Sequence, residues 1–351
     1  MQDHNISIAS GSRAQSVFHE IVSITNIFGA WNEFKKGKRK KNDVAHFELR
    51  LEENLFRLHD ELITKVYKHD PYEDFYVCDP KRRHIHKASV RDRVMHQALF
   101  RVLYPIFDKH FIYVSYSSRN DKGTHNGVAR LRDAVRKVSG NWKKKSWTLK
   151  CDVRKFFDRI DHRILRALIL KRVTCADTVW LLDLIFASFE KEEGKGLPLG
   201  NVTSQLFANI YLNELDQYAK HVLKAKHYFR YSDDFVVVHR DRKFLEECII
   251  SVSQFLFDAL RLELHPHKVE IRKASQGVDF LGYVVLPYVV VVRTKTKRRI
   301  RIKIKERIVA YKNEQISQNT FRSVVSSYLG VFSHASARRA TEFLKRIKVI
   351  L

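Results

Sequence analysis

The chain has little cysteine, glycine and proline, and each shortage excludes a class of protein. Its four cysteines lie far apart among 351 residues and form no Cys-x-x-Cys pair. A zinc ribbon and a disulfide scaffold are therefore excluded, and a reducing compartment is favoured. Twelve glycines and six prolines are too few for collagen or for a Pro/Gly-rich disordered chain.

Long apolar runs are also absent. The most apolar stretch, residues 278–292, is interrupted by Asp279, Gly282 and Pro287, and is too short to span a membrane. Residues 1–16 are polar and lack the apolar segment of a secretory signal. We therefore expect a soluble, cytoplasmic protein without a membrane partner.

Acidic residues are scarce relative to basic ones. The sequence has 65 Lys and Arg against 39 Asp and Glu, which gives a net charge of +26. This excess makes a polyanion, usually a nucleic acid, the leading partner. With 44% hydrophobic residues, 23 Phe and 14 Tyr, the chain can build sizeable cores. Its length predicts about two domains.

The apolar spacing predicts a mixture of helices and strands. Helices are expected over 44–66, 91–106, 162–170, 176–189, 204–223 and 242–260, and three short helices within 304–351. Strands are expected over 148–153, 227–232 and 235–239, and further strands through 262–292. Because no regular strand–helix–strand alternation appears, the fold class is α+β.

Three acidic residues suggest a chemistry. Asp152 ends a predicted strand, and Asp233 and Asp234 occupy the predicted turn of a hairpin, so the three carboxylates can converge. An Asp-Asp pair in a tight turn is by itself most often turn chemistry. Converging carboxylates repel one another unless a divalent cation lies between them, and carboxylate oxygens favour Mg²⁺. Two such ions suit phosphoryl transfer, which indicates a nucleotidyl transferase or a nuclease.

An ordered series of motifs resembles the bacterial reverse transcriptases. These motifs are, in chain order, residues 81–85 (KRRHI), 90–94 (VRDRV), 117–119 (SSR), 123–125 (GTH), 152–158 (DVRKFFD), 196–205 (GLPLGNVTSQ), 231–234 (YSDD), 264–268 (LHPHK) and 280–283 (FLGY). The YSDD segment alone is a weak signal, but the ordered series is a strong one. The resemblance implies a right-hand polymerase fold with fingers, a palm with an antiparallel sheet, and a short helical thumb.

The resemblance also implies domain boundaries and a metal site. It places an N-terminal extension at 1–40, fingers at 41–147, a palm at 148–290 with a fingers segment interleaved at about 165–200, and a thumb at 291–351. Asp152 and Asp233 would be the principal ligands of two Mg²⁺ ions, for which Mn²⁺ can substitute. Asp234 would contribute less directly, and the carbonyl of Val153 could complete the coordination.

Other positions match the substrate-binding residues of the family. The implied nucleotide-binding residues are Lys81, Arg83, Phe157, Leu199, Gly200 and Gln205. Phe157 would collide with a ribose 2′-hydroxyl, and Lys268 would act near the leaving pyrophosphate. The implied primer and template contacts are Arg91, Arg119, Tyr231, Phe280, Leu281 and Gly282. The ordinary alternatives are a core aromatic for Phe157 and a solvated basic run for Lys81 and Arg83. The expected partners are an RNA template, a DNA or RNA primer, and dNTPs.

One departure from the family pattern suggests a subgroup. Most members have Gln before the motif glycine and Pro after its serine, whereas this sequence has Leu199 and Gln205 there. The variant resembles the error-prone reverse transcriptases of diversity-generating retroelements, which are related to the group II intron enzymes. That reading implies a small basic accessory protein as a partner. The alternative is an antiphage defence reverse transcriptase, which copies an associated noncoding RNA. A non-catalytic RNA-binding splicing factor is a further, less favoured alternative.

Overall fold

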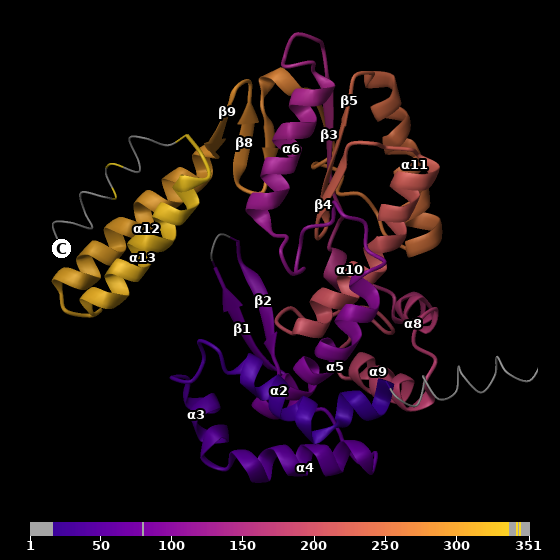
Figure 1. Cartoon of the computed structure of the whole chain (residues 1–351), viewed down its shortest axis with the longest axis vertical. Coiled ribbons are helices and arrows are strands. Elements are labelled where there is room, and N and C mark those ends of the chain that lie inside the picture. Colours follow the sequence, from indigo (N-terminus) through magenta and orange to yellow (C-terminus); the bar gives the residue numbers. More distant parts are fainter. Residues whose placement is uncertain (1–16, 79–80, 337–341, 343, 345–351) are drawn as a thin grey trace, which may run out of the picture. The chain divides into compact units, whose positions relative to one another are not determined.

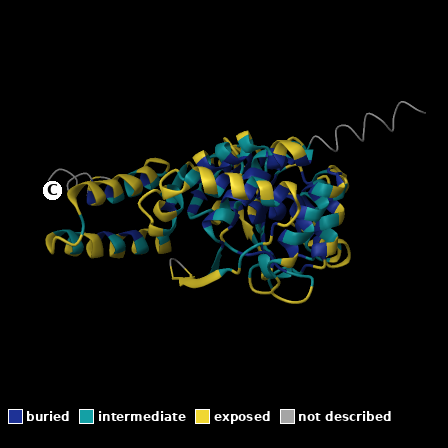
Figure 2. Ribbon diagram, turned by 90° about the horizontal axis from the view of Figure 1, so that it is seen from below, coloured by how far each residue is buried: buried dark blue, intermediate teal, exposed yellow. Residues whose placement is uncertain are grey.

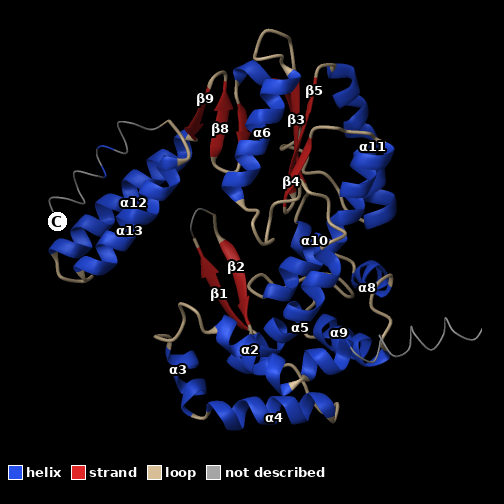
Figure 3. Ribbon diagram, in the orientation of Figure 1, coloured by secondary structure: helices blue, strands red, loops and turns tan. Residues whose placement is uncertain are grey.

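The computed structural model describes residues 17–78, 81–336, 342 and 344. It contains helices and three antiparallel sheets, which confirms the α+β class (Figures 1 and 3). The chain forms two compact units that are each discontinuous in sequence. Of the described residues, 17–113, 153–222 and 252–264 belong to the first unit, and the remainder belong to the second.

The first unit is mainly helical and carries one two-stranded sheet. Its helices are α2 (Ile24–Phe34), α3 (Asn42–Leu49), α4 (Leu51–Ile63), α5 (Val90–Asp108), α7 (Phe156–Arg159), α8 (His162–Leu170), α9 (Ala176–Ala187) and α10 (Val202–Gln217), which continues as a π-helical turn (Tyr218–Val222). The sheet is the hairpin of β1 (Glu73–Val77) and β2 (Arg83–Lys87). Helix α5 packs against α2, α4 and α10, and ten of its residues are buried.

One helix expected from the sequence is two helices. The apolar pattern over 44–66 continues without a break, but the structure ends α3 at Leu49 and begins α4 at Leu51. Arg50 between them has φ −122° and ψ 47°, which is not helical. The single-helix prediction was therefore wrong. Of the apolar face that carried it, Val44, Leu55, Leu58 and Leu62 are buried, Phe47 and Leu51 are partly buried, and Val66 is exposed.

The second unit is built on a four-stranded antiparallel sheet with the order β4-β5-β3-β6. The strands are β3 (Trp147–Asp152), β4 (Tyr228–Tyr231), β5 (Asp234–His239) and β6 (Glu270–Lys273). A second sheet joins β7 (Val278–Phe280), β8 (Tyr283–Leu286) and β9 (Val289–Val292). Helix α6 (Thr124–Val138) packs on β4, β5 and β8, and α11 (Arg242–Leu260) contributes residues to both units.

Two antiparallel helices end the described part of the second unit. Helix α12 (Thr294–Lys312) carries the basic stretch, and α13 (Gln318–Ser333) packs along it. Only Ile300 and Ile304 of α12 are buried, so most of this helix is exposed (Figure 2). The sequence placed the first helix of this region ten residues too late, because α12 has few apolar residues before Ile300. Of the third expected helix, the structure describes only residues 342 and 344, which are helical.

No helix in the described part of the chain is long and apolar enough to cross a membrane.

Candidate active site

Strand pairing in the second unit brings two of the three predicted carboxylates together. Asp152 is the last residue of β3, and the antiparallel register places it opposite Asp234, the first residue of β5. Asp233 lies in the two-residue turn between β4 and β5, where Ser232 adopts a left-handed φ of 55°. The sequence placed both Asp233 and Asp234 in the turn, whereas Asp234 belongs to the strand.

A buried arginine holds this turn. The side chain of Arg230 on β4 is fully buried, and its Nη1 donates to the carbonyl of Ser232 at 3.1 Å. Its Nη2 donates to Ser115 Oγ at 3.0 Å. A buried guanidinium is costly unless its donors are satisfied, so Arg230 fixes the strained turn that carries Asp233. Sequence reasoning missed this residue, although an arginine inside an aromatic strand next to YSDD was a visible signal.

Two lysines neutralise the carboxylates. Lys268 Nζ donates to Asp152 Oδ1 at 2.6 Å, in keeping with its expected place at the site. Lys150 Nζ lies 3.5 Å from Asp234 Oδ2 and donates to the carbonyl of Asp279 at 3.0 Å. Sequence reasoning overlooked Lys150, even though a position two residues before Asp152 shares its face of the strand.

The electrostatics favour a further cation at this place. Burial raises the pKa of Asp234 to about 6; Lys150 opposes this, and the charges of Asp152 and Asp233 add to it. Asp234 Oδ1 is buried and has no hydrogen-bond partner. Because a buried carboxylate oxygen without a partner is costly, and because hard oxygen ligands suit Mg²⁺, the residues present fit a divalent cation.

In the first unit, the Leu199–Gly200 segment packs against the β1–β2 hairpin. The amide of His86 on β2 donates to the carbonyl of Leu199 at 3.0 Å. Gly200 has φ 138°, and a Cβ at this position would lie 3.0 Å from the carbonyl oxygen of His86. The glycine is therefore required by the close approach of two backbone segments. Lys81 and Arg83, at the end of the hairpin, are exposed.

The remaining expected nucleotide contacts also lie in the first unit. Phe157 is half-buried and its carbonyl accepts from Leu197 N at 2.8 Å, whereas the adjacent Phe156 is buried. Phe156 therefore fills the core, and Phe157 stays partly accessible. Gln205 is exposed on the first turns of α10. Val153 follows Asp152 directly and forms an isolated β-bridge with Leu264.

Three of the expected primer contacts of the second unit lie at the β7–β8 turn. Leu281 and Gly282 form this turn with φ 53° and 86°, and Phe280 before it is fully buried. The turn therefore presents Leu281 and Gly282, and Phe280 anchors it. Tyr231 packs against the same core, and Arg119 Nη1 donates to the carbonyl of Ser115 at 3.1 Å.

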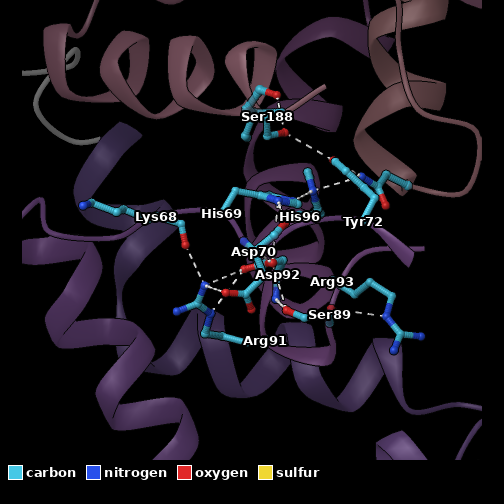
Figure 4. A network of polar contacts seen from close by, with 12 residues as sticks. Lys68, His69, Asp70, Tyr72, Ser89, Arg91, Asp92, Arg93, His96 and Ser188 are labelled. Atoms are coloured by element: carbon cyan, nitrogen blue, oxygen red, sulfur yellow. Dashed lines mark hydrogen bonds and ion pairs between the residues drawn. The ribbon is translucent and has the colours of Figure 1, made fainter. Parts of the chain in front are cut away.

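Arg91 lies in the first unit inside a polar network (Figure 4). Its guanidinium contacts Glu61 and Asp70, both at 3.0 Å, and donates to the carbonyl of Lys68 at 2.6 Å. These contacts tie α5 to α4 and to the segment before β1. Its role as a primer or template contact stays a prediction.

Comparison with known proteins assigns the family. Residues 68–285 match the reverse transcriptase (RNA-dependent DNA polymerase) family. The chain therefore belongs to the reverse transcriptase family, whose reaction is DNA synthesis on an RNA template and whose members use divalent metal ions.

Individual relatives are distant. The protein YkfC of Escherichia coli is 25% identical over 276 residues, with 67% of this chain and 72% of YkfC covered. The group II intron-encoded protein LtrA of Lactococcus lactis is 23% identical over 305 residues, and the match covers 66% of this chain but only 49% of LtrA. A solved telomerase from Candida albicans aligns with a TM-score of 0.46 at 13% identity, over 68% of this chain and 51% of that one.

Proposed function

We propose that this chain carries out RNA-directed DNA synthesis at Asp152, Asp233 and Asp234, as the error-prone reverse transcriptase of a diversity-generating retroelement. The observation that carries the catalytic part is the pairing of Asp152 with Asp234 across β3 and β5, with a buried Asp234 oxygen that has no partner. Family membership supports the reaction class.

Each residue of the cluster has a role in this proposal. Asp152 and Asp233 hold the metal ions, with help from the Val153 carbonyl, and Asp234 keeps the site negative. When bound, two Mg²⁺ ions stabilise the charge on the attacking and leaving oxygens of phosphoryl transfer. Lys268, already 2.6 Å from Asp152 Oδ1, supplies a positive charge beside the leaving pyrophosphate.

Substrate binding is proposed to use exposed residues of the first unit. Lys81 and Arg83 bind the triphosphate of the dNTP, since both are exposed and guanidinium suits bidentate phosphate contacts. The accessible part of Phe157 disfavours a ribose 2′-hydroxyl. The exposed basic residues of α12 bind the template–primer backbone, and such contacts make affinity steeply dependent on salt.

Leu199 carries the proposal of low fidelity. Its carbonyl is hydrogen-bonded to β2, and its side chain is apolar where the family pattern that the motifs resemble has glutamine. Without an amide to hydrogen-bond the incoming nucleotide, correct and incorrect substrates differ by less binding energy. The template-repeat RNA and a small basic accessory protein are the partners proposed on this basis.

Primer extension with the Asp variants tests the catalytic proposal. We expect Asp152→Asn and Asp233→Asn to lower Mg²⁺-dependent synthesis on an RNA template by more than about a thousandfold, a larger loss than that of one oxyanion hydrogen bond. Both variants should remain folded and bind RNA. Asp133→Asn, which changes an exposed aspartate of α6, serves as the matched control. Extension by the Asp152→Asn/Asp233→Asn double variant would show that the site is misassigned.

Sequencing the products tests the retroelement proposal. Errors concentrated opposite template adenines, and reduced in Leu199→Gln, would support it. Leu49→Gln makes the same change at an exposed position of the first unit and should leave the error spectrum unchanged. Accurate copying by the unaltered chain would favour an antiphage defence reverse transcriptase. The absence of products on any template would favour a non-catalytic RNA-binding protein.

A further inference from the structure

The β1–β2 hairpin carries a group of side chains that the proposed polymerase site does not use. Asp74 lies on β1, and His84 and His86 lie on β2. The antiparallel register pairs Asp74 with His86 and Tyr76 with His84. Because alternate residues of a strand share a face, the carboxylate and the two imidazoles lie on one face of the hairpin.

Their ligand atoms are close together. Asp74 Oδ1 lies 2.7 Å from His86 Nδ1, and Asp74 Oδ2 lies 3.3 Å from His84 Nε2. One ligand atom from each of the three residues lies within 4.8 Å of the other two. In the described part of the chain, this condition is met by no other group of three or more His, Cys, Asp or Glu side chains. Ligands of a tetrahedral zinc ion lie about 3.3 Å apart, as follows from bonds of about 2.0–2.1 Å. Small side-chain rotations would therefore complete the geometry.

Neighbouring rings hold both imidazoles in place. Tyr76 stacks on His84, with centroids 4.6 Å apart and an interplanar angle of 11°. The ring of Phe189 packs against that of His86, with the ring centroids 4.5 Å apart. These contacts reduce the rotamer freedom that the histidines would lose on binding a metal, so the arrangement is partly preorganised.

We propose that Asp74, His84 and His86 bind one divalent transition-metal ion, with Zn²⁺ as the expected ion and water completing its coordination. Two imidazoles and one carboxylate suit zinc-like ions, whereas Mg²⁺ prefers oxygen ligands alone. The side chain of Asp74 is 53% exposed, which leaves an open side for water.

A metal at this place would stabilise the hairpin. All five residues of β1 are exposed, and a two-stranded hairpin is marginally stable by itself. Strand β2 is anchored by the hydrogen bond from His86 to Leu199, but β1 has fewer such contacts among the described residues. An ion shared by Asp74 and the two histidines would join β1 to β2 and so order the end of the hairpin that carries Lys81 and Arg83.

Direct zinc binding tests the proposal without reference to polymerase activity. The untagged full-length chain is stripped with a chelator and titrated with ZnCl₂ by calorimetry in a buffer with excess Mg²⁺. We expect one zinc site that His84→Asn/His86→Asn weakens by more than about a hundredfold, since losing a residue outside the ligand set already costs about 10–100-fold. Asp74→Asn, which keeps the size of the side chain, should also weaken binding.

A matched control uses another His-x-His pair. His265→Asn/His267→Asn removes two equally spaced histidines whose rings lie 6.2 Å apart and which belong to no such trio in the described part of the chain. This variant should keep the affinity of the unaltered chain. Equal zinc binding by the unaltered chain and the His84→Asn/His86→Asn variant, or no binding by either, would overturn the proposal. Circular dichroism confirms that each variant is folded.

Limited proteolysis gives a second readout. Lys81, Arg82 and Arg83 are trypsin sites in the hairpin. We expect Zn²⁺ to slow cleavage at these residues in the unaltered chain and to have no effect in Asp74→Asn. Zinc-independent cleavage in both proteins would contradict the proposed ordering of the hairpin.

Discussion

In the first unit, Asp92 and His96 lie on α5 inside a network of hydrogen bonds (Figure 4). Both side chains are buried. Asp92 Oδ1 accepts from Tyr67 Oη at 2.7 Å, and Oδ2 accepts from the amide of Asp70 at 2.9 Å. The two ring nitrogens of His96 face Asn201 Nδ2 at 3.0 Å and Thr203 Oγ1 at 2.9 Å.

The carboxylate cluster of the second unit is built differently. Asp152 contacts Lys268, but Asp234 keeps a buried oxygen without a partner and a pKa raised to about 6 by burial, against the influence of Lys150. In the first cluster, both carboxylate oxygens of Asp92 and both ring nitrogens of His96 have partners, and only Asn201 Oδ1 is left without one. This cluster therefore holds helices and loops together. The second sets two lysines against three carboxylates and leaves the buried Asp234 Oδ1 without a hydrogen-bond partner, which costs stability and favours binding of a cation. The comparison separates a structural polar cluster from one suited to binding a metal.

Removing Asp92 is the change with the largest expected effect on stability. Asp92→Ala leaves the hydroxyl of Tyr67 and the amide of Asp70 without their buried acceptor and removes one of the ion pairs of Arg91, so we expect a loss of about 3–5 kcal/mol in the free energy of unfolding, measured by urea titration. Asp152→Ala should lower the free energy of unfolding by less, because the side chain of Lys268, the partner of Asp152, is 39% exposed and can be solvated by water. Equal losses for the two variants would contradict the distinction between the clusters.

The sequence predicted the central sheet of the second unit well for a physical reason. Buried apolar and aromatic runs flank the aspartates, so β3, β4 and β5 could be identified along with the convergence of Asp152 and Asp234. The β1–β2 hairpin was missed because β2 is polar apart from Ile85, and because β1 is short and exposed and so has no alternation of buried and exposed residues. Contacts between residues far apart in sequence, such as Arg230 with Ser115, leave no periodic signal.

The candidate site, like the fold, could be predicted only in part, because contacts between residues far apart in sequence leave no sequence signal. The family motifs predicted a site at Asp152, Asp233 and Lys268, whereas Lys150 and Arg230 were recognised only in the structure. Lysine and arginine are common in so basic a chain, and the structure shows that Lys150 faces Asp234 whereas Arg230 holds the turn through Ser115 and the carbonyl of Ser232.

Acid should destabilise the first unit through His96. Burial, with a smaller contribution from the neighbouring His69, lowers the pKa of His96 to about 3. The unfolded chain takes up a proton near pH 6.5 that the folded one does not, so this contribution to stability is present above pH 6.5 and is lost as pH falls. One proton changes stability by about 1.4 kcal/mol per pH unit, which gives about 2 kcal/mol between pH 6.5 and 5. Urea midpoints at pH 7.5 and 5 measure this change.

Two histidine variants make this test specific. His96→Gln removes the titrating group and should flatten the pH dependence, even if it lowers stability throughout. His267→Asn removes an exposed histidine and should leave the dependence unchanged. The same slope in His96→Gln and the unaltered chain would show that other groups cause the acid effect.

Replacing Asp234 should have the smallest effect on the free energy of unfolding, and this effect should be a gain in stability. Because the folded pKa of Asp234 is about 6 against 3.8 for an ordinary aspartate, the folded chain keeps a proton that the unfolded chain loses, and stability falls as pH rises from 3.8 to 6. Asp234→Asn removes this cost, so without Mg²⁺ we expect a gain of about 1–2 kcal/mol at pH 7.5, measured by urea titration. Adding Mg²⁺ should stabilise the unaltered chain more than the variant, because ligand binding favours the folded state. Destabilisation by Asp234→Asn in the absence of Mg²⁺ would mean that this carboxylate supports the fold as Asp92 does, and the contrast between the two clusters would fail.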